Sequence, residues 1–345
     1  MGLSRKNVST IFALLIVSTL ALALKIQPVN ATGPIYIRAD GSIDPPTAPI
    51  QRHGNVYTLT GNITSDADGI VVERDNIVVD GSGFAIEGTG TLSSNGTYLF
   101  GRSDVTIQNT NIKNFSYGIK LANSSNNSMN GNTITNSSYY GIMLYWSSKY
   151  NSIGGNTIAN NSDGIDLYDS SNYNRISENT ITNNSGYGIR LIWYANNNSI
   201  SENTITDNYC GIWLESSSNY NSISENNITN NDYGIGLGYS SNNTVCYNNF
   251  IDNTVQVSDW TPGYPNFWDN GYEGNFWSNY NGTDLNRDGI GDTPYIIEVN
   301  NRDRYPLMSI IPEFPSLLIP ALFMTATLLA VIVYKRKHTS KVNRI

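Results

Sequence analysis

The chain has 345 residues, of which 39% are hydrophobic and only 14% are charged, and its net charge is −8. Residues 32–313 contain all 28 acidic residues but only 12 of the 20 basic ones, so this segment alone carries −16. A surface this acidic argues against nucleic acid as a partner. The chain is long enough to bury a sizeable core, but it offers few charged side chains for catalysis.

Residues 1–31 have the pattern of a secretory signal peptide. Arg5 and Lys6 precede an apolar run over residues 11–24, and residues 29–31 supply a small-residue cleavage site. Cleavage there would start the mature chain near Thr32. The alternative is an uncleaved N-terminal membrane anchor, although the apolar run is short for a span.

Residues 32–106 are predicted to form an N-terminal cap and the first turns of a repeat structure. Residues 71–81 hold two stretches of alternating apolar and polar residues and a glycine bend. Irregular end turns of this kind are expected where a repeat structure must cover its open core. His53 is the only histidine of this predicted ectodomain, and it is interpreted as structural.

Residues 107–252 repeat themselves every 22 to 24 residues in three registers. One register is the second apolar anchor of an Asn-x-Ile phrase, found at Ile112, Ile134, Ile158, Ile181, Ile205, Ile228 and Phe250. Another lies five residues earlier, at Ile107, Met129, Ile153, Ile176, Ile200, Ile223 and Val245. A Gly-Ile pair recurs at Gly118, Gly141, Gly164, Gly188, Gly211 and Gly234. Self-similarity at one period indicates a solenoid.

The spacing within each repeat predicts strands. Apolar residues lie two or five apart and never at the three-and-four spacing of a helix face. Leucine-rich repeats share the length, but they need several leucines, whereas these turns are built from Asn, Ser and Gly. The sequence therefore predicts an all-β fold, a right-handed parallel β-helix, with adjacent turns about 4.8 Å apart.

An asparagine recurs at one position in six successive turns, where stacked side-chain amides can hydrogen-bond along the column. These residues are Asn132, Asn156, Asn179, Asn203, Asn226 and Asn248, and their predicted role is structural. The two cysteines, Cys210 and Cys246, lie two turns apart, which is roughly 9.6 Å before any sideways offset. A disulfide cannot span that distance, so both thiols are predicted to be free.

Residues 253–311 form an aromatic, glycine-rich segment that is suited to closing the far end of the solenoid. Its acidic loop resembles a calcium loop, with oxygen ligands at alternate positions and a glycine for the sharp turn. The predicted Ca²⁺ ligands are Asp284, Asn286, Asp288 and Asp292. The twelfth position is Tyr295 where a calcium loop has a bidentate Glu, so a metal-free turn is the alternative.

Residues 312–345 are predicted to be a membrane anchor with a basic cytoplasmic tail. Residues 316–334 carry no charge over a length that can cross a bilayer, and residues 335–337 are all basic. Positive charge marks the cytoplasmic side, which would place the solenoid outside the cell. A buried core helix is the alternative for the apolar stretch.

Over residues 70–308 the chain resembles NosD-like right-handed β-helix proteins. The likeness is carried by the repeat unit, by residues 274–278 with the loop 284–295, and by the closing segment 303–308. It implies an extracytoplasmic protein with repeats typed as carbohydrate-binding or sugar-hydrolysis modules, and a link to copper-site maturation. Residues 312–315, Pro-Glu-Phe-Pro, resemble an archaeal surface-sorting signal that a sortase-like enzyme would process.

Catalysis is considered for Asp163 and Asp166, whose surroundings are similar to the Asn-Thr-Asp-Gly phrase of polygalacturonase-type glycosidases. The phrase falls on the Gly-Ile register of every turn, and the other motifs of those enzymes are missing. Copper sites need His, Cys or Met, and these residues are not grouped in the sequence. A column of Glu178, Glu202 and Glu225 is interpreted as a solvated acidic bend, with a cation site as the alternative.

Binding of polysaccharide is the preferred function, because outward residues on one side of the solenoid combine aromatic rings with polar groups. The candidate residues are Trp146, Asp166, Asp169, Arg190, Trp193, Trp213 and Tyr239. A surface ion pair covered by rings is the alternative for this strip. A structural or adhesive envelope protein, a polysaccharide hydrolase or lyase, and a copper-related periplasmic protein stay open as other functions. The expected location is the extracellular face of the cell membrane, with abundant glycosylation sequons.

Overall fold

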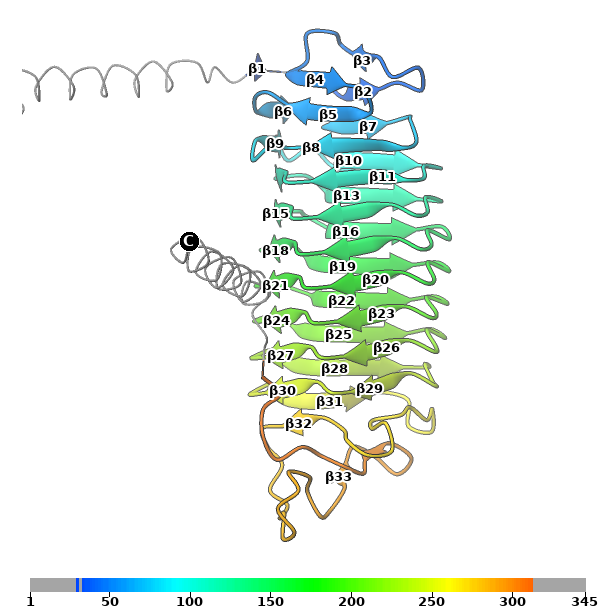
Figure 1. Cartoon of the computed structure of the whole chain (residues 1–345), viewed down its shortest axis with the longest axis vertical. Coiled ribbons are helices and arrows are strands. Elements are labelled where there is room, and N and C mark those ends of the chain that lie inside the picture. Colours follow the sequence, from blue (N-terminus) through cyan, green and yellow to red (C-terminus); the bar gives the residue numbers. More distant parts are fainter. Residues whose placement is uncertain (1–28, 31–32, 313–345) are drawn as a thin grey trace, which may run out of the picture. The chain divides into compact units, whose positions relative to one another are not determined.

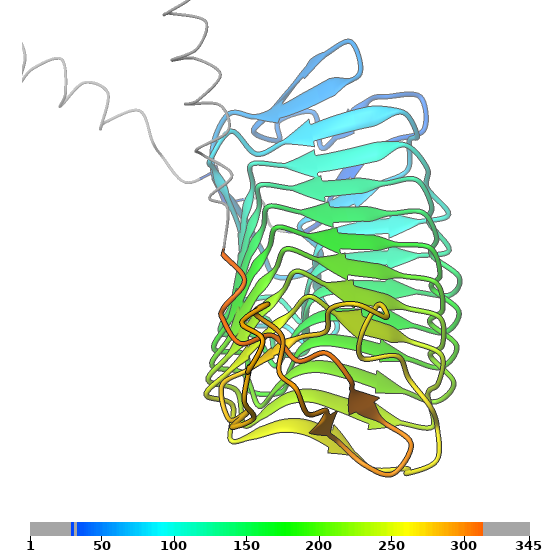
Figure 2. The same ribbon diagram turned by 60° about the horizontal axis from the view of Figure 1, so that its bottom comes forward.

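A computed structural model describes residues 29–30 and 33–312 of the chain. The described residues up to 309 form one compact unit, and of a second unit only residues 310–312 are described. The first unit is a stack of strands that coil into a parallel solenoid (Figure 1), and Figure 2 shows its successive turns lying one upon another. Three sheets of 11, 11 and 10 strands run along it.

We call these sheets A, B and C. Sheet A contains, in spatial order, β1 (Val29–Asn30), β6 (Ile63–Ser65), β9 (Ala85–Gly88), β12 (Asn111–Lys113), β15 (Thr133–Thr135), β18 (Thr157–Ala159), β21 (Thr180–Thr182), β24 (Thr204–Thr206), β27 (Asn227–Thr229), β30 (Asn249–Ile251) and β32 (Phe276–Trp277). Every pairing in this sheet is parallel.

Sheet B holds the longest strands of the repeats, most of them six residues long. They are β3 (Ile43–Asp44), β2 (Ile35–Ile37), β7 (Ile70–Val72), β10 (Asn95–Phe100), β13 (Tyr117–Ala122), β16 (Tyr140–Tyr145), β19 (Asp163–Tyr168), β22 (Tyr187–Ile192), β25 (Cys210–Glu215), β28 (Tyr233–Gly238) and β31 (Val255–Asp259). Sheet B therefore forms the widest of the three sides of each regular turn.

Sheet C lies between sheets B and A along the chain. Its strands are β29 (Thr244–Cys246), β26 (Ser222–Ser224), β23 (Ser199–Ser201), β20 (Arg175–Ser177), β17 (Ser152–Gly154), β14 (Ser128–Asn130), β11 (Val105–Gln108), β8 (Ile77–Asp80), β5 (Val56–Leu59) and β4 (Ile50–His53). A separate antiparallel pair, β33 (Tyr295–Ile296) and β34 (Arg302–Asp303), follows the last turn.

The apolar residues at the three repeated positions of the sequence form the hydrophobic core of the solenoid. Ile158, Ile181 and Ile205 are fully buried, and they pair with one another in neighbouring strands of sheet A. Alternate residues of each strand point inward, so an Ile at the same position in every turn builds a continuous aliphatic stack. The predicted parallel solenoid and its buried anchors are confirmed.

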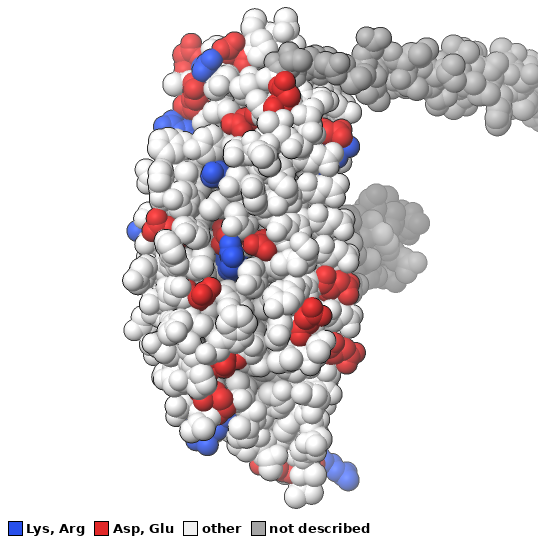
Figure 3. Space-filling view, turned by 180° about the vertical axis from the view of Figure 1, so that it is seen from behind, with Lys and Arg blue, Asp and Glu red and all other residues white. Residues whose placement is uncertain are grey.

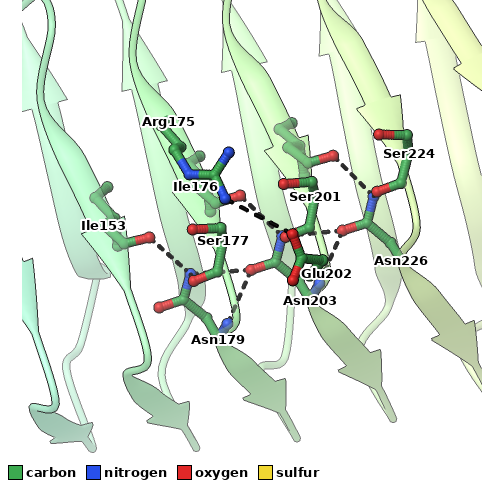
Figure 4. A network of polar contacts seen from close by, with 11 residues as sticks. Ile153, Arg175, Ile176, Ser177, Asn179, Ser201, Glu202, Asn203, Ser224 and Asn226 are labelled. Atoms are coloured by element: carbon green, nitrogen blue, oxygen red, sulfur yellow. Dashed lines mark hydrogen bonds and ion pairs between the residues drawn. The ribbon is translucent and has the colours of Figure 1, made fainter. Parts of the chain in front are cut away.

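The corners are held by columns of asparagine. In the predicted column, the Nδ2 group of Asn179 donates to Oδ1 of Asn203 at 2.9 Å, and that of Asn203 donates to Oδ1 of Asn226 at 2.9 Å (Figure 4). Each Nδ2 group also donates to a main-chain carbonyl of the preceding turn, for example that of Ile176 at 3.0 Å. The predicted structural role of this column is confirmed.

The solenoid has two further asparagine columns that the sequence analysis missed. The column before sheet C contains Asn127, Asn151, Asn174, Asn198, Asn221, Asn243 and Asn266. The column between sheets A and B contains Asn161, Asn184, Asn208, Asn231 and Asn253. Each corner of the cross-section is thus fixed by buried amides that satisfy both their own groups and the main chain.

The N-terminal end differs from the regular turns. Strands β4 and β5 pair in antiparallel fashion, as do β2 and β3, whereas β5 continues into sheet C by parallel pairing with β8. His53, at the end of β4, is exposed. Antiparallel hairpins at this end cover the first turn, which agrees with a capping role for this part of the chain.

The C-terminal end is closed by stacked aromatic rings. Trp277 stacks on Phe250 of the last regular turn, with ring centroids 4.4 Å apart, and Tyr295 stacks on its other side at 4.3 Å. Trp268 and Trp277 are each only 1% exposed. These rings cover the open end of the aliphatic stack, as the sequence predicts for this segment.

The predicted asparagine column continues from Asn248 to Asn275 and ends at Asp303 inside this cap. Its Oδ2 atom accepts the main-chain N–H of Asn275 at 2.7 Å and the indole N–H of Trp277 at 2.9 Å. Its Oδ1 atom accepts the N–H of Tyr305 at 3.0 Å. Burial nevertheless raises the pKa of Asp303 to about 6, because removing a carboxylate from water disfavours its charged form.

This carboxyl should make stability depend on pH. Because the folded state holds the Asp303 proton more tightly than the unfolded chain does, its contribution to the free energy of unfolding falls as the pH rises from about 4 to about 6. We expect the stability difference between wild type and Asp303→Asn to be larger at pH 4 than at pH 7. Chemical denaturation at both pH values checks this, and a difference that grows with pH would contradict it.

The predicted signal peptide and membrane anchor lie almost wholly outside the described residues. Residues 316–334 and 335–337 are not described, nor are residues 1–28. Within residues 29–30 and 33–312, no helix is long and apolar enough to cross a membrane. The predicted cleavage, anchoring and sortase-like processing therefore stay predictions.

Both cysteines are free, as predicted. Cys210 is fully buried, and burial raises the pKa of its thiol above the usual range, whereas Cys246 is half-buried. We expect denatured, unreduced protein to react at both positions with a thiol reagent, and folded protein to react faster at Cys246. Finding no free thiol after denaturation without reductant would contradict the structure.

Candidate functional site

The outer face of sheet B carries the residues that the sequence analysis singled out. Its strands pair in register, so equivalent positions of successive turns lie side by side. The outward position between the buried Ile and Leu of each strand is held by Lys120, Met143, Asp166, Arg190, Trp213 and Gly236. The predicted alignment of these side chains on one side of the solenoid is confirmed.

Arg190 of β22 organises a polar cluster on this face. Its Nη2 group lies 2.7 Å from Oδ2 of Asp166 and 3.5 Å from Oδ2 of Asp163, both on β19. The same group donates to the hydroxyl oxygen of Tyr140 on β16 at 3.0 Å. One guanidinium thus holds two carboxyls from the preceding turn and a phenol from the turn before that.

Tyrosine rings enclose this cluster. The guanidinium carbon of Arg190 lies 5.1 Å from the ring centre of Tyr187 and 5.6 Å from that of Tyr140. Asp166 is completely buried, and Asp163 is 8% exposed. The sequence suggested an ion pair among Asp166, Asp169 and Arg190, but the second carboxyl beside Arg190 is that of Asp163, at the start of β19.

Burial dominates the electrostatics of the two aspartates. It raises the pKa of Asp166 to about 6 although Arg190 lies beside it, and it raises the pKa of Asp163 as well. Oδ1 of Asp166 and Nε of Arg190 are buried without a hydrogen-bond partner in the described structure. The cluster is an enclosed, partly satisfied ion network, and its inner carboxyl does not reach the surface.

The exposed part of the site lies at the corner between sheets B and C. The residue that follows each of the six sheet B strands from β13 to β28 has a positive φ of 49° to 55°, which turns its side chain outward at the same place in these turns. This corner column consists of Asn123, Trp146, Asp169, Trp193, Ser216 and Tyr239. Trp146 and Trp193 are both 49% exposed and Tyr239 is 57% exposed.

Tyrosines at the strand ends support the two tryptophans. The ring of Trp146 stacks on Tyr145 with centroids 4.7 Å apart, and that of Trp193 lies 5.1 Å from Tyr168. Tyr145 and Tyr168 are themselves 5.4 Å apart. Since each indole is backed on one side, it is held in place while much of its surface stays open to solvent.

Trp213 differs from the other predicted aromatic residues because it is only 4% exposed. Its ring occupies the space above Gly236, where an added Cβ would lie 2.0 Å from it. It also contacts Trp260, with ring centroids 4.8 Å apart, and its indole N–H donates to Glu215 at 3.1 Å. Trp213 packs the face and offers no open ring surface.

Further exposed tyrosines lie on the same corner and were missed by the sequence analysis. Tyr150 and Tyr173 stack with ring centroids 5.3 Å apart, and Tyr220 holds the equivalent position two turns later. All three are more than 45% exposed. The signal that could have found them is their fixed distance, four residues, after the corner position of each turn.

The predicted calcium ligands lie together in one exposed loop after β32. Asp284 accepts the main-chain N–H groups of Asp288 and Gly289, and Asp292 accepts that of Leu285. The Asn286 amide donates to Asp288 at 2.9 Å. The loop therefore holds its shape with its own carboxylates, and calcium binding by it stays a prediction.

The soft ligands that copper prefers are scattered. Within residues 29–30 and 33–312, no three His, Cys, Asp or Glu side chains form a group that could hold a metal ion. Cys210 and Met129 are completely buried, and His53 lies in the N-terminal hairpin. A copper centre does not fit the described residues.

The predicted acidic column stands on the bend between sheets C and A. Glu178, Glu202 and Glu225 are exposed and have φ values near 60°. Glu202 lies 3.7 Å from Arg175 of the preceding turn (Figure 4). A solvated bend with one exposed ion pair accounts for these residues.

Solved structures of the same architecture are distant in sequence. The Dettilon tailspike protein has a TM-score of 0.55 at 15% identity, over 71% of this chain and 53% of that one. Tailspike protein 2 from the Escherichia coli O157:H7 bacteriophage CAB120 has a TM-score of 0.54 at 15% identity, over 79% and 41% of the two chains. A double mutant of the periplasmic alginate epimerase AlgG has a TM-score of 0.44 at 15% identity, over 66% and 72%.

A match to a protein family is more specific than these distant structural similarities. None of the curated proteins matches the sequence. The NosD family, described as periplasmic copper-binding protein (NosD), matches residues 62–282, which is well over half of the chain. This match covers the regular turns of all three sheets, and the chain belongs to the NosD family.

Proposed function

We propose that this protein is an extracytoplasmic solenoid that binds polysaccharide along the corner between sheets B and C. The observation that carries the proposal is the recurrence of half-exposed rings in the corner column, at Trp146, Trp193 and Tyr239. The family description places NosD proteins in the periplasm, which supports a location outside the cytoplasm.

Open aromatic rings on a rigid scaffold suit sugar recognition. The apolar C–H faces of sugar rings stack on indole and phenol rings, while hydroxyl groups need hydrogen-bond partners nearby. Trp146 and Trp193 are fixed by Tyr145 and Tyr168, so their orientation is set before a ligand arrives. Such preorganisation lowers the entropic cost of binding.

Binding fits the geometry better than cleavage does. Glycoside hydrolysis needs two carboxyls that reach the sugar bond from opposite sides. Asp166 is completely buried beneath tyrosine rings, and both Asp163 and Asp166 are engaged by Arg190. We therefore assign these aspartates to the packing of the face.

Removing the two indoles should abolish most of the binding. We expect the Trp146→Ala, Trp193→Ala double variant of the full chain to bind polysaccharide about tenfold more weakly than wild type, because each ring loses its stacking contact. Affinity electrophoresis against a panel of neutral, acidic and amino-sugar polysaccharides measures this. The Tyr272→Ala variant is a matched control, since Tyr272 is 80% exposed but lies in the C-terminal cap.

Each result of this experiment has a clear meaning. Equal retention of the double variant and wild type on a retarding polysaccharide would show that another surface binds it. Absence of retardation of wild type on every polysaccharide would leave a structural or adhesive role. Release of shorter sugar products by wild type would favour a hydrolase or lyase and reopen the assignment of Asp163 and Asp166.

A further inference from the structure

The corner column alternates between aromatic and small polar residues. Trp146, Trp193 and Tyr239 occupy every second turn, and Asp169 and Ser216 occupy the turns between them. The main chain confirms that these turns are direct neighbours, since the N–H of Ser147 donates to the carbonyl of Asp169 and that of Ser170 to the carbonyl of Trp193, each at 2.9 Å. The three rings therefore form a row parallel to the solenoid axis.

The spacing of this row is fixed by the fold. Neighbouring parallel strands are about 4.8 Å apart, so rings on alternate turns lie about 10 Å apart along the axis. The columns of buried asparagine hold each turn directly above the previous one, which keeps this spacing constant along the row. A ligand that uses all three rings must present an apolar face at the same interval.

We propose that the ligand is an extended, uncharged, β-1,4-linked polysaccharide that lies along this row. In such a chain consecutive sugars are rotated by about half a turn, so every second sugar turns the same face to one side. The disaccharide repeat is close to two strand spacings, so the same face would meet each ring in succession. The proposal rests on the polysaccharide-binding function above and specifies its ligand.

The polar positions agree with this arrangement. Asp169 lies in the turn between the two indoles and is only partly buried, so its carboxylate can accept hydrogen bonds from hydroxyl groups of the intervening sugar. Ser216 holds the same position between Trp193 and Tyr239. A hydroxyl-rich sugar needs such partners where it offers no apolar face to a ring.

The charge of the protein selects against acidic polysaccharides. Residues 32–313 carry −16, and no lysine or arginine belongs to the corner column. Arg190, on the outer face of sheet B, is already paired with two carboxyls. Figure 3 shows a face with few and scattered charges, most of it neither acidic nor basic. The net negative charge of residues 32–313 would repel a polyanion, whereas it would not repel an uncharged chain.

Ligand chemistry and length test the proposal. With wild-type full chain we expect tryptophan fluorescence titrations to show binding of β-1,4-linked glucan oligosaccharides, with affinity that increases with every two sugars until three rings are covered. Soluble α-1,4-linked glucan and polygalacturonate should bind at least about tenfold more weakly. Equal affinity for these polymers, or affinity that does not depend on oligosaccharide length, would overturn the proposal.

Moving one ring by a single turn tests the spacing itself. The Trp193→Ser, Ser216→Trp double variant keeps the number of rings but places the two indoles three turns apart. We expect it to lose about as much affinity as Trp193→Ala with Ser216 unchanged, provided that its circular dichroism and unfolding temperature match those of wild type. Retained affinity would show that aromatic content matters and spacing does not.

The outcomes separate the two proposals. If no polysaccharide binds, the proposed function itself fails. If a polysaccharide binds through Trp146 and Trp193 but shows no preference for linkage, charge or length, polysaccharide binding stands and the ligand assignment fails.

Discussion

Replacement of Asn203 by alanine is expected to lower the free energy of unfolding by about 4 kcal/mol, because it leaves several buried polar groups without partners. The Oδ1 atom of Asn203 accepts both the main-chain N–H and the amide of Asn179, at 3.0 and 2.9 Å. Its Nδ2 group donates to the carbonyls of Ile176 and Ser201 and to Asn226.

A matched control separates the loss of the column from the loss of an asparagine. Asn130, on β14, is partly buried and its amide donates only to Ser128, at 3.2 Å, so Asn130→Ala is expected to change stability by no more than about 0.5 kcal/mol. Urea denaturation followed by far-ultraviolet circular dichroism measures both variants. Equal denaturation midpoints would show that the asparagine columns do not stabilise the turns.

Replacement of Gly188 by alanine is expected to destabilise the protein by about 3 kcal/mol, because the added methyl group has no space between two turns. An ideal Cβ at Gly188 would lie 2.6 Å from the carbonyl oxygen of Gly211 and 2.8 Å from Cγ2 of Ile205. The oxygen belongs to the main chain of the next turn, so relief requires the turns to separate locally. The Gly-Ile register thus reflects close approach of stacked main chains.

Gly154 provides the control for this substitution. It lies in β17 without a positive φ, and the nearest atom to its ideal Cβ, the carbonyl oxygen of Ser177, is 3.5 Å away. Gly154→Ala should be neutral or slightly stabilising, since it reduces the freedom of the unfolded chain. Thermal unfolding of the two variants compares them. A Gly188→Ala protein as stable as Gly154→Ala would contradict the close packing of the turns.

The sequence was sufficient to predict the solenoid because one physical constraint repeats. Each turn must place an inward aliphatic residue above that of the previous turn, and this requirement recurs in the sequence every 22 to 24 residues. The ends do not repeat, so their structure depends on single contacts such as that of Asp303 with Trp277. The antiparallel hairpin of β4 and β5 likewise occurs once and has no counterpart in the repeat.

The candidate site was predicted less completely than the solenoid, because it also depends on single contacts that do not repeat. Alternation along a strand correctly indicates which strand side chains point outward, and the repeat register identified the corner residues Trp146, Trp193 and Tyr239 that follow the strands. It does not indicate which outward side chains are covered by residues from neighbouring turns. Asp166 is buried between Met143 and Arg190 of the neighbouring turns, and Trp213 is buried above a glycine.

The asparagine columns also give the solenoid a net dipole along its axis. In each column the amide N–H of one turn points toward the oxygen of the next, so the amide dipoles add as peptide dipoles do in a helix, with the positive end at the C-terminal cap. Two columns end there on acidic groups, one on Asp303 and the other, through Asn301, on Asp259 and Glu298. The asparagine columns of the described solenoid are therefore polarised along its axis, and carboxylates at their C-terminal ends balance the accumulated partial charge.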